Sequence, residues 1–359
     1  MKGYQFEDTQ GTFHLKKAEN ISYLYFPIAG EAGLKSSFTP NLGGDAKIDQ
    51  NTFLLEPVSA ENLVNNRNSR NFWCNVKGIG SWSLTGHSAE ELSKKFTEMQ
   101  DDSEVTAGFM WQKTTRESKK YQLRGEILSF IPVDKNVEIM LVTITNTGRM
   151  AQTVTPTAAI PLYGRSADNI RDHRHVTSLL HRIETTDTGV LVTPTLSFDE
   201  RGHQVNHMTY YCVGWSGNGE KPVDFYPTAE DFVGEGGNFE RPYAIVKKCR
   251  GGQGRNKDRR IRGSWWSSFF RDYIRAGRGM QLSDLYRNYR RYSGDQESFQ
   301  NLYDQRESTG RTGKNKSILA GKSKCCLSYR RFRFQPVYAL GKLSANSASY
   351  LWLFLPSAS

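Results

Sequence analysis

Residues 121–145 read YQLRGEILSFIPVDKNVEIMLVTIT, and this segment is the strongest indication of the fold class. Two runs rich in β-branched and other apolar residues, 121–132 and 137–145, flank a short turn that holds Pro132 and Asn136. Runs of this composition, bounded by turn residues, are typical of β-strands. The segment therefore predicts two strands joined by a tight connection.

The same pattern continues downstream at a spacing that favours antiparallel sheets. Further strand-like runs occupy residues 153–160, 176–183, 189–198 and 208–215, and the segment TDTG at 186–189 is typical of a hairpin turn. Strands at this spacing indicate sheets packed face to face. We expect an all-β fold, an antiparallel β-sandwich with one or two short helices, followed by an irregular basic tail.

The clearest helical signal covers residues 89–99. Ser88 can cap a helix, with Glu91 three residues further on, and Leu92, Phe96 and Met99 recur at helical spacing. These positions predict one helix of about three turns with one apolar face.

Charge divides the chain into two parts. The protein has 359 residues and a net charge of +11, but residues 1–246 carry 24 Lys and Arg against 30 Asp and Glu. Residues 247–359 carry 24 Lys and Arg against 7 Asp and Glu, a single valine (Val337) and no histidine. We therefore expect a β-rich domain at 1–246 and a basic, low-order tail at 247–359.

Two origins of the tail are open. It is either a disordered basic arm or a coding sequence read out of frame from near Lys247 and Lys248, where repeated adenines would invite slippage. With freely chosen synonymous codons, a one-base shift gives residues 270–307 strand alternation and residues 311–327 a helical pattern. We expect a frameshift, so that the natural domain is truncated after about residue 246. Binding of the tail to nucleic acid is expected to be non-specific, through its positive charge.

The cysteines and the chain start indicate a reducing, aqueous compartment. The five cysteines are odd in number and irregular in spacing, which predicts free thiols and no Cys/His metal frame. Residues 1–10 hold acidic side chains where a signal peptide is apolar, and no apolar run approaches the ~20 residues of a membrane span. We expect a cytoplasmic protein with no membrane contact.

Several long strings resemble one known family. They are SYLYFPIAGEAGLKSSFTPNLGGDAKIDQNTFLLEPVSAENL at 22–63, RNFWC at 70–74, AGFMWQKTTRES at 107–118, YGRSADNIRDHRHVTSLLHRI at 163–183 and DFVGEGGNFERP at 231–242. Together they span most of residues 1–246. They resemble the N-terminal region of cellobiose and cellodextrin phosphorylases of glycoside hydrolase family 94, formerly glycosyltransferase family 36.

The resemblance implies a large β-supersandwich of two stacked antiparallel sheets. In that family a helical linker and an (α/α)6 barrel follow, and the barrel holds the catalytic aspartate and the phosphate pocket. The implied reaction is inverting phosphorolysis of a β-glucoside or oligosaccharide, with inorganic phosphate as co-substrate and no metal or organic cofactor. An inverting phosphorylase needs only the acid of the usual carboxylate pair, because phosphate is the nucleophile. We expect no catalytic residue in this chain, and a homodimer by analogy.

A polar loop before residue 176 is the best candidate for sugar binding. Its charged side chains could hydrogen-bond sugar hydroxyls; they are Arg165, Asp168, Arg171, Asp172 and His173. The alternative, which we favour, is an internal Arg–Asp network that fixes the loop or a subunit interface.

Aromatic and histidine side chains give two further candidates. Trp73 could stack on a pyranose ring, as could Trp82 and Trp111, but a position in the core is favoured for them. His173, His175 and His181 could approach a metal, but no carboxylate or thiol completes the set, and no metal site is expected.

Three hypotheses for function follow. The chain is the N-terminal sandwich domain of a glycoside phosphorylase, a stand-alone carbohydrate-binding or assembly module, or a nucleic-acid-binding protein that acts through its tail.

Overall fold

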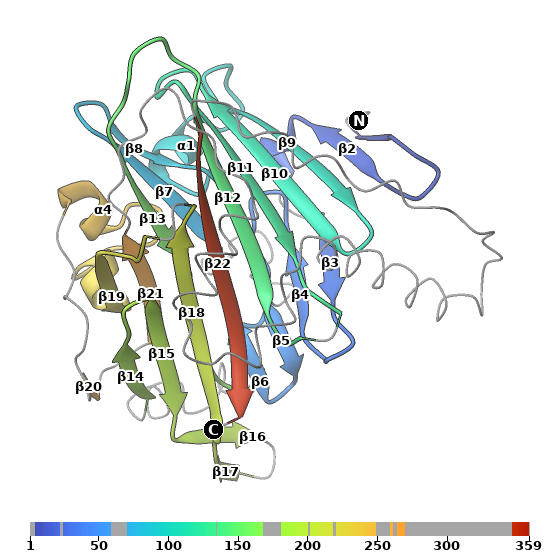
Figure 1. Ribbon diagram of the computed structural model, residues 1–359, viewed down its shortest axis with the longest axis vertical. Coiled ribbons are helices and arrows are strands. Elements are labelled where there is room, and N and C mark those ends of the chain that lie inside the picture. Colours follow the sequence, from blue (N-terminus) through green and yellow to red (C-terminus); the bar gives the residue numbers. More distant parts are fainter. Residues whose placement is uncertain are drawn as a thin grey trace.

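The computed structural model describes residues 4–21, 24–58, 70–133, 135–167, 181–199, 202–217, 220–248, 259–260, 264–269 and 347–358. In these segments the strands form four sheets of eleven, five, four and two strands, and neighbouring strands pair antiparallel throughout (Figure 1). The predicted all-β class is confirmed.

The largest sheet contains most of residues 121–145. Its strands, in spatial order, are β1 (Tyr4–Phe6), β2 (Phe13–Lys16), β9 (Asp102–Gly108), β10 (Trp111–Ser118), β11 (Leu123–Phe130), β12 (Glu138–Asn146), β22 (Ser347–Ala358), β18 (Met208–Ser216), β15 (Gly189–Pro194), β14 (His181–Thr185) and β20 (Arg259–Arg260). β11 and β12 pair over nearly their whole length, with Ile127 opposite Val142. The two strands predicted from residues 121–145 are therefore confirmed.

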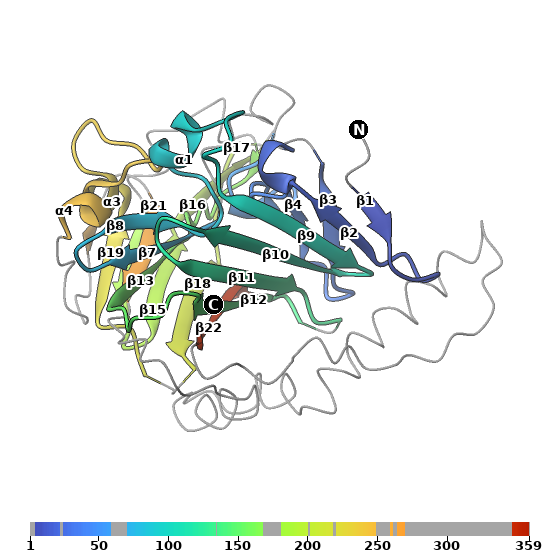
Figure 2. The same ribbon diagram turned by 90° about the horizontal axis from the view of Figure 1, so that it is seen from above.

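Smaller sheets lie against this one. A five-stranded sheet has the order β19 (Asp224–Thr228), β21 (Ser264–Phe269), β13 (Val154–Ala159), β7 (Asn71–Val76) and β8 (Gly80–Ser83). A four-stranded sheet has the order β3 (Phe26–Ala29), β4 (Lys35–Phe38), β5 (Ala46–Asp49) and β6 (Thr52–Leu55), and β16 (Leu196–Asp199) pairs with β17 (Gly202–Val205). Figure 2 shows the five-stranded sheet and β1–β2 at opposite ends of the molecule.

The main hydrophobic core joins the large sheet to the two smaller ones. It brings together Leu54 from β6, Phe72 from β7, and Val142 and Val192 from the large sheet, each almost fully buried. β11 alternates between buried and more exposed residues, as expected for a strand with one covered face, whereas every residue of β7 is buried. The sheets thus form a packed sandwich rather than an open layer.

The helices are short, and one is shorter than predicted. α1 (Ala89–Ser93), α3 (Ala229–Val233) and α4 (Tyr243–Lys247) have five residues each, and a 3-10 turn (Ala18–Asn20) precedes them. No helix in the described segments is long and apolar enough to cross a membrane.

Ser88 caps α1, because its hydroxyl accepts the Glu91 N–H at 3.2 Å, as the sequence predicted. The extension to Met99 is wrong: Phe96 adopts a left-handed conformation at φ 65°, which a continuing helix cannot contain. Phe96 and Met99 are exposed by 78% and 75%, so the predicted apolar face does not pack on the core.

Three short parts of the basic tail form strands in the described segments. β20, β21 and β22 lie beyond residue 246 but pair within the two larger sheets, and β22 separates β12 from β18 (Figure 1). The sequence SASYLWLFLPSA of β22 is an apolar run with strand-forming residues at its centre. Such a run can join a sheet through its backbone even where the surrounding sequence shows no periodicity. Residues 249–258, 261–263 and 270–346 lie outside the described segments.

Candidate functional site

The start of the predicted sugar-binding loop runs beside β6. The Tyr163 N–H donates to the Leu54 carbonyl at 2.6 Å, and the Phe53 N–H donates to the Arg165 carbonyl at 3.0 Å. Gly164 has φ 64°, and a Cβ there would lie 3.3 Å from the Tyr210 ring, so both the backbone and the space favour glycine. These bonds fix where the loop leaves the sandwich.

Arg165 is held inside the protein. Its side chain is buried, and its guanidinium lies 5.2 Å from the centre of the Tyr163 ring, a cation–π contact. The backbone bond from Phe53 positions it on the flank of β6. Arg165 therefore lies inside the protein at the base of the loop.

His181, the first residue of β14, shares this environment. Its imidazole is fully buried, and neither ring nitrogen has a hydrogen-bond partner within the described segments. Burial lowers the pKa of His181 to about 3, and the positive charge of Arg165 contributes to the same decrease. The ring is therefore neutral at physiological pH.

The remaining predicted loop residues, Asp168, Arg171, Asp172 and His173, lie outside the described residues, as does His175. Their approach to Arg165 or to a sugar stays a prediction. Within the described part of the chain, His, Cys, Asp and Glu side chains form no group of three that could hold a metal ion.

Trp73 lies in a small core rather than on a binding surface. Its side chain is only 3% exposed and belongs to a cluster with Ala159, Tyr226, Phe232 and Ile245. An indole buried in this way has no face that a pyranose ring can cover. The structure therefore favours the core position over the sugar-stacking role of Trp73.

Trp82 is also buried, and its indole N–H donates to the Asp101 carboxylate at 2.7 Å. Trp111 is half-buried and its ring lies against Gly108, where a Cβ would come within 2.5 Å of the indole nitrogen. Of the three tryptophans, Trp111 alone retains partly exposed surface.

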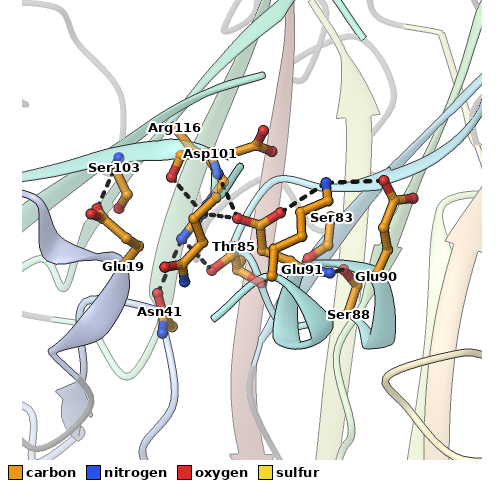
Figure 3. A network of polar contacts seen from close by, with 12 residues as sticks. Glu19, Asn41, Ser83, Thr85, Ser88, Glu90, Glu91, Asp101, Ser103 and Arg116 are labelled. Atoms are coloured by element: carbon orange, nitrogen blue, oxygen red, sulfur yellow. Dashed lines mark hydrogen bonds and ion pairs between the residues drawn. The ribbon is translucent and has the colours of Figure 1, made fainter. Parts of the chain in front are cut away.

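A buried ion network that the sequence did not predict centres on Arg116 of β10 (Figure 3). Arg116 Nη1 lies 3.5 Å from Glu91 Oε1 and 3.5 Å from the Asp101 carbonyl. Arg116 Nη2 donates to the Asn41 side-chain oxygen and to the Thr85 carbonyl, both at 3.3 Å. One side chain thereby joins β10 to α1, to the turn after β4 and to the end of β8.

The Glu91 carboxylate is the acidic centre of this network. It accepts the Asp101 N–H at 2.7 Å through Oε1, and Lys94 Nζ lies 3.5 Å from Oε2. Burial raises the pKa of Glu91, while the Asp101 amide, Arg116 and Lys94 oppose that rise. In a capping box this carboxylate would turn back to the Ser88 amide, but here it faces Asp101 and Arg116.

A glycine makes room for the guanidinium. Gly86 has φ 79°, and a Cβ at this position would lie 2.3 Å from Arg116 Nη2. The turn after β8 therefore needs glycine for two reasons, its left-handed backbone and the presence of Arg116.

A second buried ion pair joins Arg70, just before β7, to Glu138, the first residue of β12. Arg70 Nε and Nη2 donate to the two Glu138 carboxylate oxygens at 2.5 and 2.8 Å, and the Ser36 hydroxyl donates to the same carboxylate at 2.5 Å. Arg70 Nη1 also donates to the Gly44 carbonyl at 3.3 Å, and the guanidinium lies 4.3 Å from the centre of the Phe38 ring. This pair fastens the four-stranded sheet to both larger sheets.

These networks position elements rather than present reactive groups. Glu91, Glu138, Arg70 and Arg116 are all buried and already bound to protein groups. A general acid has to reach the oxygen of the bond that breaks, which these carboxylates cannot do. Cys74 and Cys212 are free, as predicted, and burial raises the pKa of both thiols, so they too are unreactive.

The comparisons with known proteins agree with this architecture. The family model described as the glycosyl hydrolase 94 supersandwich domain matches residues 55–259, more than half of the chain. The chain therefore belongs to the glycosyl hydrolase 94 supersandwich family, and the resemblance seen in the sequence is confirmed. A search of curated proteins gave no match. The class of protein is thus the sandwich domain of a carbohydrate-active enzyme.

Proposed function

We propose that the chain is the N-terminal sandwich of an inverting glycoside phosphorylase that acts on β-glucosides, and that it supports a catalytic domain without catalysing the reaction itself. The observation that carries this proposal is the family match over residues 55–259. The acid and the phosphate-binding groups of such an enzyme would lie in a following barrel domain.

The pairing of buried arginines with carboxylates favours a supporting role for the domain. A phosphorylase needs an accessible carboxylic acid and a cationic, hydrogen-bonding cradle for phosphate. Of the buried arginines in the described segments, Arg70 is engaged with Glu138 and Arg116 with Glu91. Displacing either carboxylate by phosphate would leave a buried charge without its partner, at a cost of several kcal/mol.

The first test is phosphorolysis by the purified chain. It is incubated with inorganic phosphate and cellobiose or longer cellodextrins, and release of sugar 1-phosphate is measured. We expect no release above a mock purification, while a complete phosphorylase of the family in the same buffer gives product. Release that rises in proportion to the amount of this chain would refute the supporting role.

A second measurement asks whether the domain acts together with a barrel. The coding sequence for the full chain, residues 1–359, replaces the sandwich of a complete family phosphorylase, and the chimera is assayed on β-glucosides. We expect activity in the chimera and none when the sandwich is deleted. Equal activity with and without a sandwich would remove the proposed role.

A further inference from the structure

The centre of the large sheet depends on a strand from the far end of the chain. β22 pairs with β12 from Thr145 opposite Ser347 to Glu138 opposite Phe354. On its other side β22 pairs with β18 from Ser216 opposite Tyr350 to Met208 opposite Ala358. The strand is antiparallel to both neighbours, so it completes two ladders at once.

Removing β22 from its place would split the eleven-stranded sheet. One side of the gap would hold six strands, β1, β2, β9, β10, β11 and β12. The other side would hold β18, β15, β14 and β20. The two edges exposed in this way belong to core strands, since almost every residue of β12 is buried and Tyr210 and Cys212 of β18 are fully buried. An edge of this kind, with its backbone groups unpaired, is a strong template for another strand.

A strand that enters such a gap is recognised mainly through its backbone. Added strands bind through backbone hydrogen bonds, and this makes the site tolerant of sequence but strict about extended conformation. Proline has no backbone N–H, so a strand tolerates it best where one side of the strand is unpaired. Pro356 meets this condition, because it lies beyond the β12 ladder, where β22 has β18 as its one paired neighbour. Leu353, in contrast, has Ile139 opposite it on one side and Val213 on the other.

The segment between β21 and β22 is long enough for β22 to reach the sheet of its own copy or that of a second copy. β21 ends at Phe269 and β22 begins at Ser347, so 77 residues separate them. A chain of this length can span at most about 260 Å. The entropic advantage of the tethered strand falls as its linker lengthens, so a strand from a second copy competes best at high protein concentration.

We propose that the space between β12 and β18 is a strand-acceptor site, and that β22 of a second copy of the chain can occupy it in place of the chain's own β22. Reciprocal exchange between two copies gives a closed, two-fold symmetric dimer. The inference rests on the strand pairing and on the length of the connection to β22, and it does not depend on the proposed enzymatic context.

The test uses the full chain with its own strand disabled. Leu353→Pro removes a backbone N–H in the part of β22 that has neighbours on both sides, so the variant should leave the acceptor site open. The probe is a fluorescein-labelled peptide of residues 347–358 with two added lysines for solubility, and binding is followed by fluorescence anisotropy. A peptide with the same Leu353→Pro change is the matched control.

We expect the labelled peptide to bind the Leu353→Pro chain at least about tenfold more tightly than it binds the unchanged chain, whose site is filled. We also expect the proline peptide to bind neither. Equal binding of both peptides, or a Leu353→Pro chain that keeps its unfolding temperature and binds no peptide, would overturn the proposal.

If the Leu353→Pro chain aggregates, refolding in the presence of each peptide decides the question. Recovery of soluble protein with the unchanged peptide and not with the proline peptide supports an acceptor site, and equal recovery refutes it. For the second copy, the unchanged chain is refolded at increasing concentration and sized by light scattering. We expect a dimer fraction that rises with concentration and is absent from the Leu353→Pro chain; a monomer at every concentration would rule out exchange.

Discussion

Arg70 and Glu138 form a two-pronged ion pair in the interior, although 68 residues separate them in the sequence. Both side chains are almost completely buried, and Ser36 adds a third hydrogen bond to the carboxylate. Arginine suits this position, because its planar guanidinium matches both carboxylate oxygens and still reaches backbone carbonyls of the turn after β4. The pair therefore fixes the relative placement of β4, β7 and β12.

Breaking this pair from one side should destabilise the fold strongly. Arg70→Met removes the cation and leaves Glu138 buried without its main partner, and such changes cost about 3–5 kcal/mol. The free energy of unfolding in guanidinium chloride measures the loss. The double variant Arg70→Met with Glu138→Gln should lose at least about 1 kcal/mol less than the two single losses added together, because the residues interact directly.

The matched control for this cycle is the exposed pair of Arg124 and Glu126, whose closest atoms lie 3.4 Å apart. Arg124→Ala should change stability by less than about 1 kcal/mol, as for other surface pairs. A loss in Arg70→Met no larger than that in Arg124→Ala would show that the buried pair does not hold the sheets together.

Gly86→Ala should lower the free energy of unfolding by more than the strain of its backbone conformation alone explains. The new Cβ would meet Arg116 Nη2 at 2.3 Å, in addition to the strain of φ 79°. Gly78→Ala is the control, since its φ of 84° is similar and no atom lies within 4 Å of its Cβ. Each alanine should cost about 1 kcal/mol for the left-handed backbone, and Gly86→Ala should lose roughly a further 1–3 kcal/mol by overpacking. Equal losses in thermal or chemical unfolding would contradict the close approach of Arg116 to Gly86.

Much of the sheet architecture was predictable, because strand patterns are local. The alternation in residues 121–145 and the turn at 186–189 each depend on neighbouring residues, and the strands β11, β12, β14 and β15 follow them. The helix predicted to reach Met99 already ends at Ser93, and Phe96 beyond it takes a left-handed backbone that its side chain does not signal. The place of β22 depends on a gap between two distant strands, which no local pattern encodes.

The polar sites were less predictable for a related reason. Arg116 lies in the string AGFMWQKTTRES and Arg70 begins RNFWC, but their partners Glu91 and Glu138 are 25 and 68 residues away. A charged residue inside an otherwise buried strand pattern is a usable signal, since it demands a partner. It does not identify the partner. Trp73 illustrates the opposite case, because aromatic residues in a sandwich are equally suited to the core and to a sugar, and only packing separates the two.

His181 should make the fold sensitive to mild acid. Its pKa is about 3 in the folded protein and about 6.5 in an unfolded chain, so the unfolded state binds more protons between these values. The stability contributed by the neutral ring is therefore complete above about pH 6.5 and is lost as the pH falls toward 3. The slope reaches about 1.4 kcal/mol per pH unit for one proton.

His181→Phe, which cannot be protonated, should flatten the dependence of unfolding free energy on pH between about 6 and 4 by this amount. Gly78→Ala, which changes no titratable group, should leave the dependence unchanged. The raised pKa of Glu91 acts in the opposite direction but is present in all three proteins, so it cancels in the comparison. Parallel curves for the unchanged chain and His181→Phe would show that the imidazole is not held neutral by its surroundings.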